Sequence, residues 1–422
     1  MTRHHNTMDL QISKPLTLKC GLTLPNRLVK AAMTEQLADT KSHLPTPSFL
    51  RPYKAWAAGG WGLVLTGNVQ VDEVHLGQPR DTAVSSAVEA STVLASFKEW
   101  AAVCNAHGTP TIVQINHPGR QSPPGAGDRS FFAKTLAPSA VPLRLGDDPI
   151  SRALSAIAFG TPKAMSVDEI KDVIRRFAET ARITAEAGFQ GVQVHGAHGY
   201  LVAQFLSAKT NTRTDAYGGS PAKRARFAVE IVEAIRAVVP KEFCVGIKLN
   251  SVDHQSKAEL SDCVEQLKLI AQAGVDFIEV SGGSYEDPTM SRGPIAVEGK
   301  SERTKAREAF FLDFAAAIRD QFPDVPLVVT GGFRTRQGME SAVRDGGCDA
   351  VGVGRPAVLN PSLPLNTVFN KEIDDASAKL YAKKIESPWF LQKIGLKNVG
   401  AGIEISWYSK AMGDIDPTKA SL

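Results

Sequence analysis

The rest of the chain can be interpreted from the stretch GVQVHGAHGYLVAQFLSAKTNTRTDAYGGS, residues 191–220. An alternating apolar run over residues 189–194, typical of a buried strand, passes abruptly to His195, His198 and Tyr200. Buried His and Tyr side chains need polar partners. One interpretation is that the two histidines are structural core residues whose hydrogen-bonding groups have partners, beside a tyrosine at an interface. Because three polar groups converge on one loop at a strand end, we favour a functional site.

The composition is that of an ordinary globular protein. The chain has 422 residues, of which 43% are hydrophobic and 22% charged, and a net charge of +4. Its basic residues are scattered, so we expect neither nucleic acid nor a membrane surface as a partner. No apolar run approaches the roughly 18 residues that span a bilayer, and residues 1–9 lack the apolar core of a signal peptide. We expect a cytoplasmic monomer or homodimer.

The cysteines do not form a metal or disulfide motif. They are far apart and show no CxxC spacing, which argues against zinc, an iron–sulfur cluster and a disulfide framework. We interpret them as small core residues in a reducing compartment, and we predict no metal site. These residues are Cys20, Cys104, Cys244, Cys263 and Cys348.

Eight apolar runs, each expected to form a strand, alternate with helical patterns along the chain. The SVDE sequence from Ser166 predicts a capping box at the start of one helix, and Gly188 predicts its end. The expected strands cover residues 27–32, 61–68, 111–115, 189–194, 243–249, 275–280, 326–329 and 350–353. The expected helices cover residues 47–60, 89–107, 166–187, 221–238, 259–273, 304–322 and 336–345.

Eight strand-then-helix units predict an α/β fold, the (β/α)8 TIM barrel, enlarged by long loops and a tail. An open doubly wound sheet is the alternative, but it would concentrate its site at one switch point, whereas here polar residues follow almost every strand. We expect the barrel in residues 1–360 and a C-terminal helical tail, residues 361–422, packed on it, with residues 381–395 on its outside.

Two long segments have no sustained periodicity. Residues 116–161, after the third strand, are rich in Pro, Gly and Ser, and residues 284–300 follow the sixth strand. Unstructured connections of this length are uncommon in compact domains and are usually lids or binding loops. We therefore expect them to close over a substrate or to contact a cofactor.

In a barrel the reacting groups lie at the C-terminal ends of the strands. The residues there include no acidic pair, so glycoside hydrolysis lacks its carboxylates, and the chain has no GxSxG nucleophile elbow. Glycine-rich turns follow the last two strands and could hold a phosphate, although a single glycine pair is often only a tight turn. The phosphate candidates are Gly331, Gly332, Gly354 and Arg355.

Lys248 lies at the end of the fifth expected strand and has two functional interpretations, besides that of a solvated or paired lysine. As a fixed cation it could stabilise negative charge on an electron-poor ring, and as a free amine it could form a Schiff base with a carbonyl substrate. Gln114 offers a donor and an acceptor to an imide-like edge, although a lone glutamine is more often structural.

These motifs together resemble the old yellow enzyme family of flavin-dependent ene-reductases. The resemblance extends from PLTLKCGLTLPNRLV, residues 15–29, to AVGVGRPAVLNP, residues 350–361. Its most specific part is HGAHGYLVAQFLSAKTNTRTDAYGGS, supported by QINHPGRQ and VVTGGF. The resemblance implies non-covalently bound FMN at the mouth of a (β/α)8 barrel, NADPH or NADH as hydride donor, and an α,β-unsaturated carbonyl or nitro compound as substrate.

The resemblance also implies a role for each candidate residue. His195 and His198 would bind the substrate oxygen, and Tyr200 would donate the proton. Lys248 would lie near N1 and O2 of the flavin, where most relatives have arginine, and Ala32 replaces a common proline. The remaining cofactor residues would be Ala31, Ala32, Met33 and Thr34 along the flavin, Asn68 and Gln114 at its pyrimidine half, and Gly331, Gly332, Gly354 and Arg355 at its phosphate.

Two alternatives remain open at this stage. A carbon–carbon lyase could use Lys248 as a Schiff-base amine on the same barrel, and a flavin-binding protein could lack catalysis altogether. The dienoyl-CoA reductase branch of the family is disfavoured because its cysteine-rich cluster and additional domains are missing. The choice between NADH and NADPH and the identity of the alkene do not follow from the residues.

Overall fold

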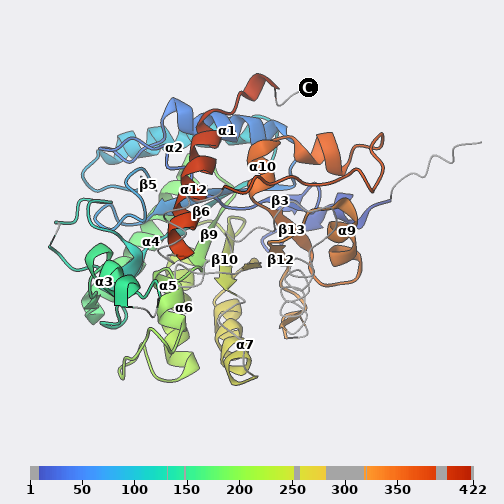
Figure 1. Ribbon diagram of the computed structural model, residues 1–422. Coiled ribbons are helices and arrows are strands. Elements are labelled where there is room, and N and C mark those ends of the chain that lie inside the picture. Colours follow the sequence, from blue (N-terminus) through green and yellow to red (C-terminus); the bar gives the residue numbers. More distant parts are fainter. Residues whose placement is uncertain are drawn as a thin grey trace, which may run out of the picture.

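The computed structural model describes residues 9–130, 132–146, 149–250, 257–281, 318–319, 321–385 and 397–419. The expected lid over residues 284–300 lies outside the described residues, as do most of the predicted helix over 304–322 and of the tail stretch 381–395. Figure 1 shows the fold as a central barrel of strands surrounded by helices.

Among the described residues, eight parallel strands form the barrel. The first of them, β3, pairs with both the last, β13, and the second, β4, which closes the sheet. This closure confirms the predicted (β/α)8 barrel and makes the open-sheet alternative wrong. The strands are β3 (Leu28–Lys30), β4 (Leu63–Gln70), β6 (Thr111–Asn116), β9 (Gly191–Gly196), β10 (Cys244–Asn250), β11 (Phe277–Ser281), β12 (Leu327–Thr330) and β13 (Ala350–Val353).

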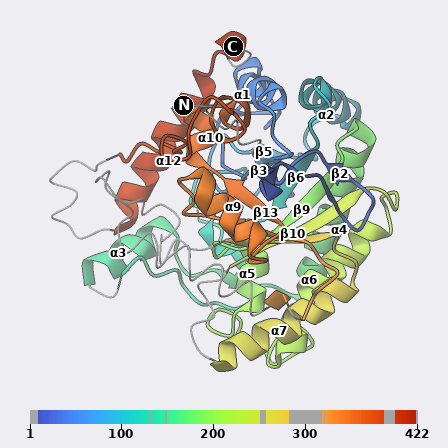
Figure 2. The same ribbon diagram turned by 90° about the vertical axis from the view of Figure 1, so that its right-hand side faces the viewer.

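The helices lie outside the barrel, with α1 and α2 on one side and α6 and α7 on the other (Figures 1 and 2). The predicted capping box is present in α4, where Glu169 N–H donates to Ser166 Oγ at 3.2 Å. Gly188 ends that helix in a left-handed conformation, φ 97°. The helices are α1 (Pro47–Ala58), α2 (Ala90–Asn105), α4 (Val167–Ala187), α6 (Pro221–Arg236), α7 (Lys257–Gln272) and α9 (Arg336–Arg344).

The barrel interior is apolar in the half that lies toward the N-terminal ends of the strands. Because side chains alternate across a strand, every second residue points inward. Inward residues such as Leu63, Ile112 and Phe277 form one cluster, and Leu18 and Leu24, beside the hairpin of β1 (Leu16–Thr17) and β2 (Thr23–Leu24), belong to the same cluster. The hairpin therefore closes the N-terminal end of the barrel, and only the C-terminal end is free to hold a site.

The long connection after the third strand is more ordered than its sequence predicts. It contains a short helical turn, η2 (Gly119–Gln121), the pair β7 (Leu136–Ala137) and β8 (Lys163–Ala164), and the helix α3 (Pro149–Ala158). The prediction of a connection without secondary structure was wrong. A usable signal was present, because Pro149 is favoured at the first position of a helix and Gly160, with φ 65°, stops it.

Two strand boundaries also differ from prediction. β3 ends at Lys30, so residues 31–33 form the loop at the mouth, and β4 continues through Asn68 to Gln70. A short helix that the sequence did not predict, α5 (Leu201–Leu206), begins directly after Tyr200. Within the described part of the chain, no helix is both long enough and apolar enough to cross a bilayer.

The described tail returns to the barrel. Its helix α12 (Lys397–Gly413) lies against α1 and against the short helix α10 (Arg355–Leu359), and Figures 1 and 2 both show it beside them. The helix α12 therefore reaches the same end of the barrel at which β3 and β13 terminate.

We expect Gly246→Ala to destabilise the protein. A Cβ at this inward position of β10 would overlap the ring of Phe277 on the adjacent strand, so the packed interior would have to shift. Overpacking of this kind costs about 1–3 kcal/mol of the free energy of unfolding. Urea denaturation of the purified variant measures it.

The matched control is Gly402→Ala in α12, where a Cβ would meet nothing within 4 Å. It should leave stability unchanged or raise it by up to about 1 kcal/mol, because alanine favours a helix over glycine. Equal stability of both variants would contradict the described packing of the barrel interior.

Candidate active site

Three of the predicted residues meet at the end of β9. His195 lies within the strand and is 2% exposed, whereas His198 and Tyr200 follow it and are partly buried. The His195 ring lies edge-on to both, with centroid distances of 4.9 Å to His198 and 4.8 Å to Tyr200. The predicted cluster therefore exists as a set of contacts, with His195 at its centre.

Both imidazoles are held in the neutral form. Burial lowers the pKa of His195 and of His198 well below the usual value, and the positive charge of Lys248 lowers both further. The Ala197 N–H donates to Nδ1 of His195 at 3.2 Å, which leaves the proton on Nε2. His195 can therefore donate a hydrogen bond from Nε2 while carrying no charge.

The His198 loop has a strained backbone that neighbouring segments support. His198 adopts φ 58° and Gly199 φ 74°, a left-handed pair that few side chains tolerate. The Gln121 side chain donates to the carbonyl of His198 at 2.9 Å, and the Gln204 side chain donates to that of Gly199 at 2.8 Å. The QINHPGRQ motif contains Gln121, yet sequence alone did not single out either glutamine.

A polar network fills the half of the barrel interior that lies toward the C-terminal ends of the strands. Lys248 Nζ lies 3.0 Å from Oε1 of Glu279, and the Gln193 side chain donates to Oε2 of Glu279 at 2.7 Å. Gln114 in turn donates to Gln193 at 2.6 Å. Sequence reasoning found Lys248 and Gln114 but missed Glu279 and Gln193. The available signal was a polar residue at an inward position of an otherwise apolar strand.

The segment that follows β3 lies along the end of β13. Ala31 N–H donates to the carbonyl of Val353 at 2.9 Å, and a Cβ on Gly354 would contact the sulfur of Met33 at 3.5 Å. Ala32, between them, is half-buried. Residues that are more than 300 positions apart are therefore adjacent at the mouth.

Thr34 is hydrogen-bonded to a buried acid. Its hydroxyl donates to Asp81 at 3.2 Å, and Asp81 also accepts from the Gln70 side chain at 2.7 Å and from the Gln78 N–H at 3.0 Å. Burial raises the pKa of Asp81 to about 7, although the hydrogen bonds lower it. The charge beside Thr34 therefore changes near neutral pH.

The predicted phosphate residues gather where β12 and β13 end. Gly331 and Gly332 have φ 130° and 83°, conformations that favour glycine, and Gly354 precedes α10. Arg355 Nη1 lies 2.8 Å from Oε1 of Glu404 in the tail helix. The tail also contacts the other side of the mouth, because Ser409 Oγ donates to the carbonyl of Thr34 at 3.2 Å.

Buried acceptor atoms at the mouth are consistent with a bound flavin. Asn68 pairs in register with Gln114, and Asn116 and Thr330 occupy the next inward positions of their strands. In the described part of the chain, one side-chain oxygen of each of Asn68, Asn116 and Thr330 is buried without a hydrogen-bond partner. Such atoms are costly unless a ligand satisfies them. An imide N–H, as in an isoalloxazine ring, is a suitable donor.

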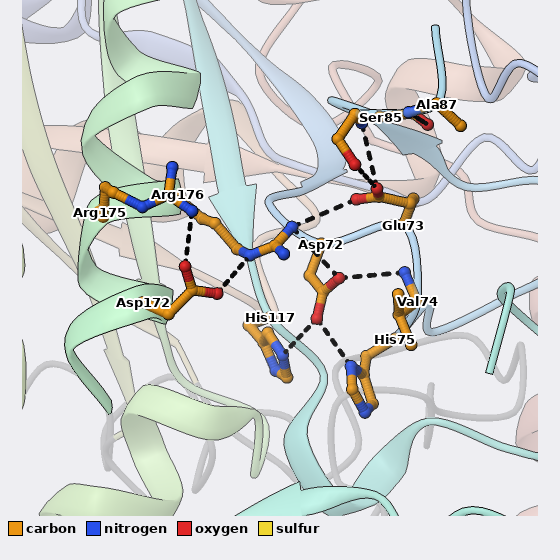
Figure 3. Close-up of polar contacts among 11 residues, drawn as sticks. Asp72, Glu73, Val74, His75, Ser85, Ala87, His117, Asp172, Arg175 and Arg176 are labelled. Carbon is orange, nitrogen blue, oxygen red and sulfur yellow. Dashed lines mark hydrogen bonds and ion pairs between the residues drawn. The ribbon is translucent and has the colours of Figure 1, made fainter. Parts of the chain in front are cut away.

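A second cluster, shown in Figure 3, lies beyond the ends of β4 and β6. Asp72 Oδ2 lies 2.7 Å from Nδ1 of His75 and 3.5 Å from Nε2 of His117, and Arg176 from α4 lies 3.5 Å from Oδ1. Burial raises the pKa of Asp72, but the two histidines more than offset this and leave it lowered.

The composition of this cluster resembles a metal site, but its hydrogen bonds do not. The Gly119 N–H donates to Nδ1 of His117 at 3.0 Å, so the proton of that neutral ring is on Nε2, the atom that faces Asp72. A metal ligand would need a lone pair there. The Asp72 carboxylate therefore accepts from Nδ1 of His75 at 2.7 Å, and the Nε2–H of His117 faces it at 3.5 Å without a hydrogen bond. The backbone carbonyl of His117 accepts from Leu201 N–H at 3.0 Å, which connects this cluster to the chain after Tyr200.

The chain matches a known protein family and is similar to named members of it. Residues 11–372 match the model of the NADH:flavin oxidoreductase / NADH oxidase family. An NADH-dependent flavin oxidoreductase of Neonectria sp. (strain DH2) is 54% identical over 409 residues, which is 95% of this chain and 53% of that protein. One of Hypocrea jecorina (strain QM6a) is 50% identical, over 92% of this chain and 96% of the relative. The chain thus spans about half of the first relative and nearly all of the second.

Solved structures have the same fold. The complex of 2-naphthoyl-CoA reductase with 2-naphthoyl-CoA superimposes with a TM-score of 0.70 at 26% identity, over 84% of this chain and 51% of the reductase. The old yellow enzyme homologue from Zymomonas mobilis superimposes with a TM-score of 0.65 at 22% identity, over 84% and 91% of the two chains. The second likeness concerns the barrel alone.

We expect Asp81→Asn to change the pH dependence of stability. The folded protein retains the Asp81 proton up to about pH 7, whereas an unfolded chain releases it near pH 4. The stabilising contribution of the neutral acid is therefore lost as the pH rises between these values. Asparagine is neutral throughout, so the variant should gain stability relative to the wild type between pH 5 and pH 8. Urea unfolding at both pH values measures this, and a difference that does not vary with pH would contradict it.

Proposed function

Since the chain belongs to the NADH:flavin oxidoreductase / NADH oxidase family, it is a flavin-dependent oxidoreductase, and we propose that it reduces activated alkenes. The substrate would be an α,β-unsaturated carbonyl or nitro compound, and FMN would be the flavin. NADH or NADPH would supply the hydride. We favour NADH because the Neonectria and Hypocrea relatives are named as NADH-dependent.

The observation that supports alkene reduction is the group of two neutral imidazoles and a phenol at the end of β9. Reduction of an enone develops negative charge on the carbonyl oxygen and requires a proton at the α-carbon. His195 Nε2–H could donate to such an oxygen, and His198, whose Nε2 lies 3.1 Å from Ser281 Oγ, would be the second donor. Tyr200 lies against His195 and would deliver the proton.

A bound FMN would supply the hydride that reaches the β-carbon of the alkene. The residues proposed to hold it lie on four sides of the mouth: the loop after β3, the inward ends of β4 and β6, the end of β10, and the turns after β12 and β13. They are Ala31, Ala32, Met33, Thr34, Asn68, Gln114, Lys248, Gly331, Gly332, Gly354 and Arg355.

The contacts of Lys248 disfavour the lyase alternative. Its side chain is 3% exposed and its Nζ is in an ion pair with Glu279. A Schiff base would require a substrate carbonyl to reach that atom after the buried ion pair had been broken, which leaves an uncompensated carboxylate. Borohydride trapping of a carbonyl substrate on Lys248 would contradict this assignment.

Removal of either histidine should slow alkene reduction. We expect His195→Ala and His198→Ala each to lose about 2–4 kcal/mol of transition-state stabilisation, by analogy with other oxyanion donors. Steady-state kcat/KM with cyclohexenone measures the loss. His107→Ala, which removes an exposed histidine, is the control and should be unaffected. Unchanged turnover in both site variants would overturn the proposal.

Loss of the phenol should affect only one half-reaction. Tyr200→Phe removes the proposed proton donor, so we expect slow oxidation of the reduced enzyme by the alkene and normal reduction by the nicotinamide. Stopped-flow spectroscopy separates the two steps. Tyr381→Phe is the matched control, because Tyr381 is 65% exposed. Equal loss in both half-reactions would refute the assignment.

The cofactor itself can be tested with the purified protein. We expect a yellow protein whose visible spectrum is that of an oxidised flavin, with a long-wavelength charge-transfer band when a phenol is added. NADH oxidation in the presence of an enone distinguishes an active enzyme from a flavin-binding protein without catalysis. A colourless protein that binds no added FMN would contradict the proposal.

A further inference from the structure

We propose that Glu279 is a positioning residue that lowers the reduction potential of the bound flavin by neutralising Lys248. Glu279 Oε1 and Lys248 Nζ are 3.0 Å apart, and their side chains are 0% and 3% exposed. Water screens a pair this deeply buried only weakly, so its internal attraction is strong. The inference rests on the proposed function for the position of the flavin at the mouth.

The position of Lys248 connects its charge to the active site. Lys248 lies beside His195 in the register of β10 and β9, and beside Glu279 in the register of β10 and β11. Its positive charge lowers the pKa of both His195 and His198. Groups that are held next to the two histidines are therefore within the electrostatic range of Lys248.

One hydrogen bond and one ion pair orient the Glu279 carboxylate. Its Oε1 faces Lys248, and its Oε2 accepts from the Gln193 side chain at 2.7 Å. Gln193 in turn accepts from Gln114.

The consequence concerns the charge that a flavin gains on reduction. Two-electron reduction by a hydride donor leaves negative charge on the ring, and a nearby cation stabilises it. A lysine alone would raise the reduction potential. A lysine that is already paired with a carboxylate contributes little net charge, so the reduced form is stabilised less. Glu279 thus sets how readily the flavin passes its hydride on.

The test is the midpoint potential of the FMN-bound Glu279→Gln variant, measured by equilibration with a reference dye. Glutamine keeps a hydrogen-bond acceptor for Gln193 but removes the charge, so we expect a more positive potential. Sulfite is a second probe, because it adds to oxidised flavins and leaves the ring negatively charged. The variant should bind sulfite roughly tenfold or more tightly, because the charge of Lys248 would no longer be offset by a carboxylate and would stabilise the negatively charged adduct.

Asp276→Asn is the matched control. Asp276 directly precedes β11, three residues before Glu279, and is paired with Arg236 at the other end of the barrel. The Asp276→Asn substitution removes one negative charge from the same part of the chain, at a distance from the mouth. It should leave the reduction potential and the sulfite affinity unchanged. Equal shifts in both variants would overturn the proposal, because they would show a general effect of net charge.

Lys248→Gln covers the case in which Glu279→Gln does not fold because of its unpaired cation. Lys248→Gln should lower the potential, and adding Glu279→Gln to it should raise the potential again. A flavoprotein whose potential and sulfite affinity do not respond to Glu279 would overturn this inference and leave the proposed function intact. A chain that binds no FMN would overturn both.

Discussion

Closure of the sheet is the constraint on which the site depends. β3 pairs with β4 on one side and with β13 on the other, so the first and last strands of the barrel become neighbours. Ala31 can then bond to Val353, and Met33 can lie beside Gly354. In an open sheet these segments would lie at opposite edges. Closure also leaves a single free end, because the β1–β2 hairpin covers the other.

The free end carries an unusual amount of buried polarity. The N-terminal half of the interior is a cluster of aliphatic and aromatic side chains, whereas the C-terminal half holds an ion pair, several amide side chains and two imidazoles. A buried ion pair seldom adds stability over an apolar pair of the same size, because both charges lose their hydration. Such a network is therefore better explained by chemistry at the mouth than by folding.

The tail helix α12 makes two contacts at this mouth. Glu404 pairs with Arg355, and Ser409 contacts the carbonyl of Thr34. Burial raises the pKa of Glu404, while the Arg355 guanidinium lowers it. The arginine proposed to hold a phosphate is thus already paired with a carboxylate from α12. A phosphate bound by Arg355, as proposed, would therefore share this side chain with the ion pair that joins α12 to the barrel.

The sequence by itself determined the alternation of strands and helices and the residues at the strand ends. Those features depend on neighbours: a period of two or 3.6 residues, a capping box at Ser166 and a glycine stop at Gly188. It failed for α3, whose proline and glycine signals were outweighed by a composition typical of loops.

Only the tertiary structure decided which of these residues touch. Glu279 lies 31 positions from Lys248 and Glu404 lies 49 from Arg355, and no local pattern relates the members of either pair. Their contacts follow from the register of parallel strands and from the path of the tail. Neither contact can be derived from one segment alone, because register is set between neighbouring strands and the position of the tail is set by the packing of α12 on α1 and α10.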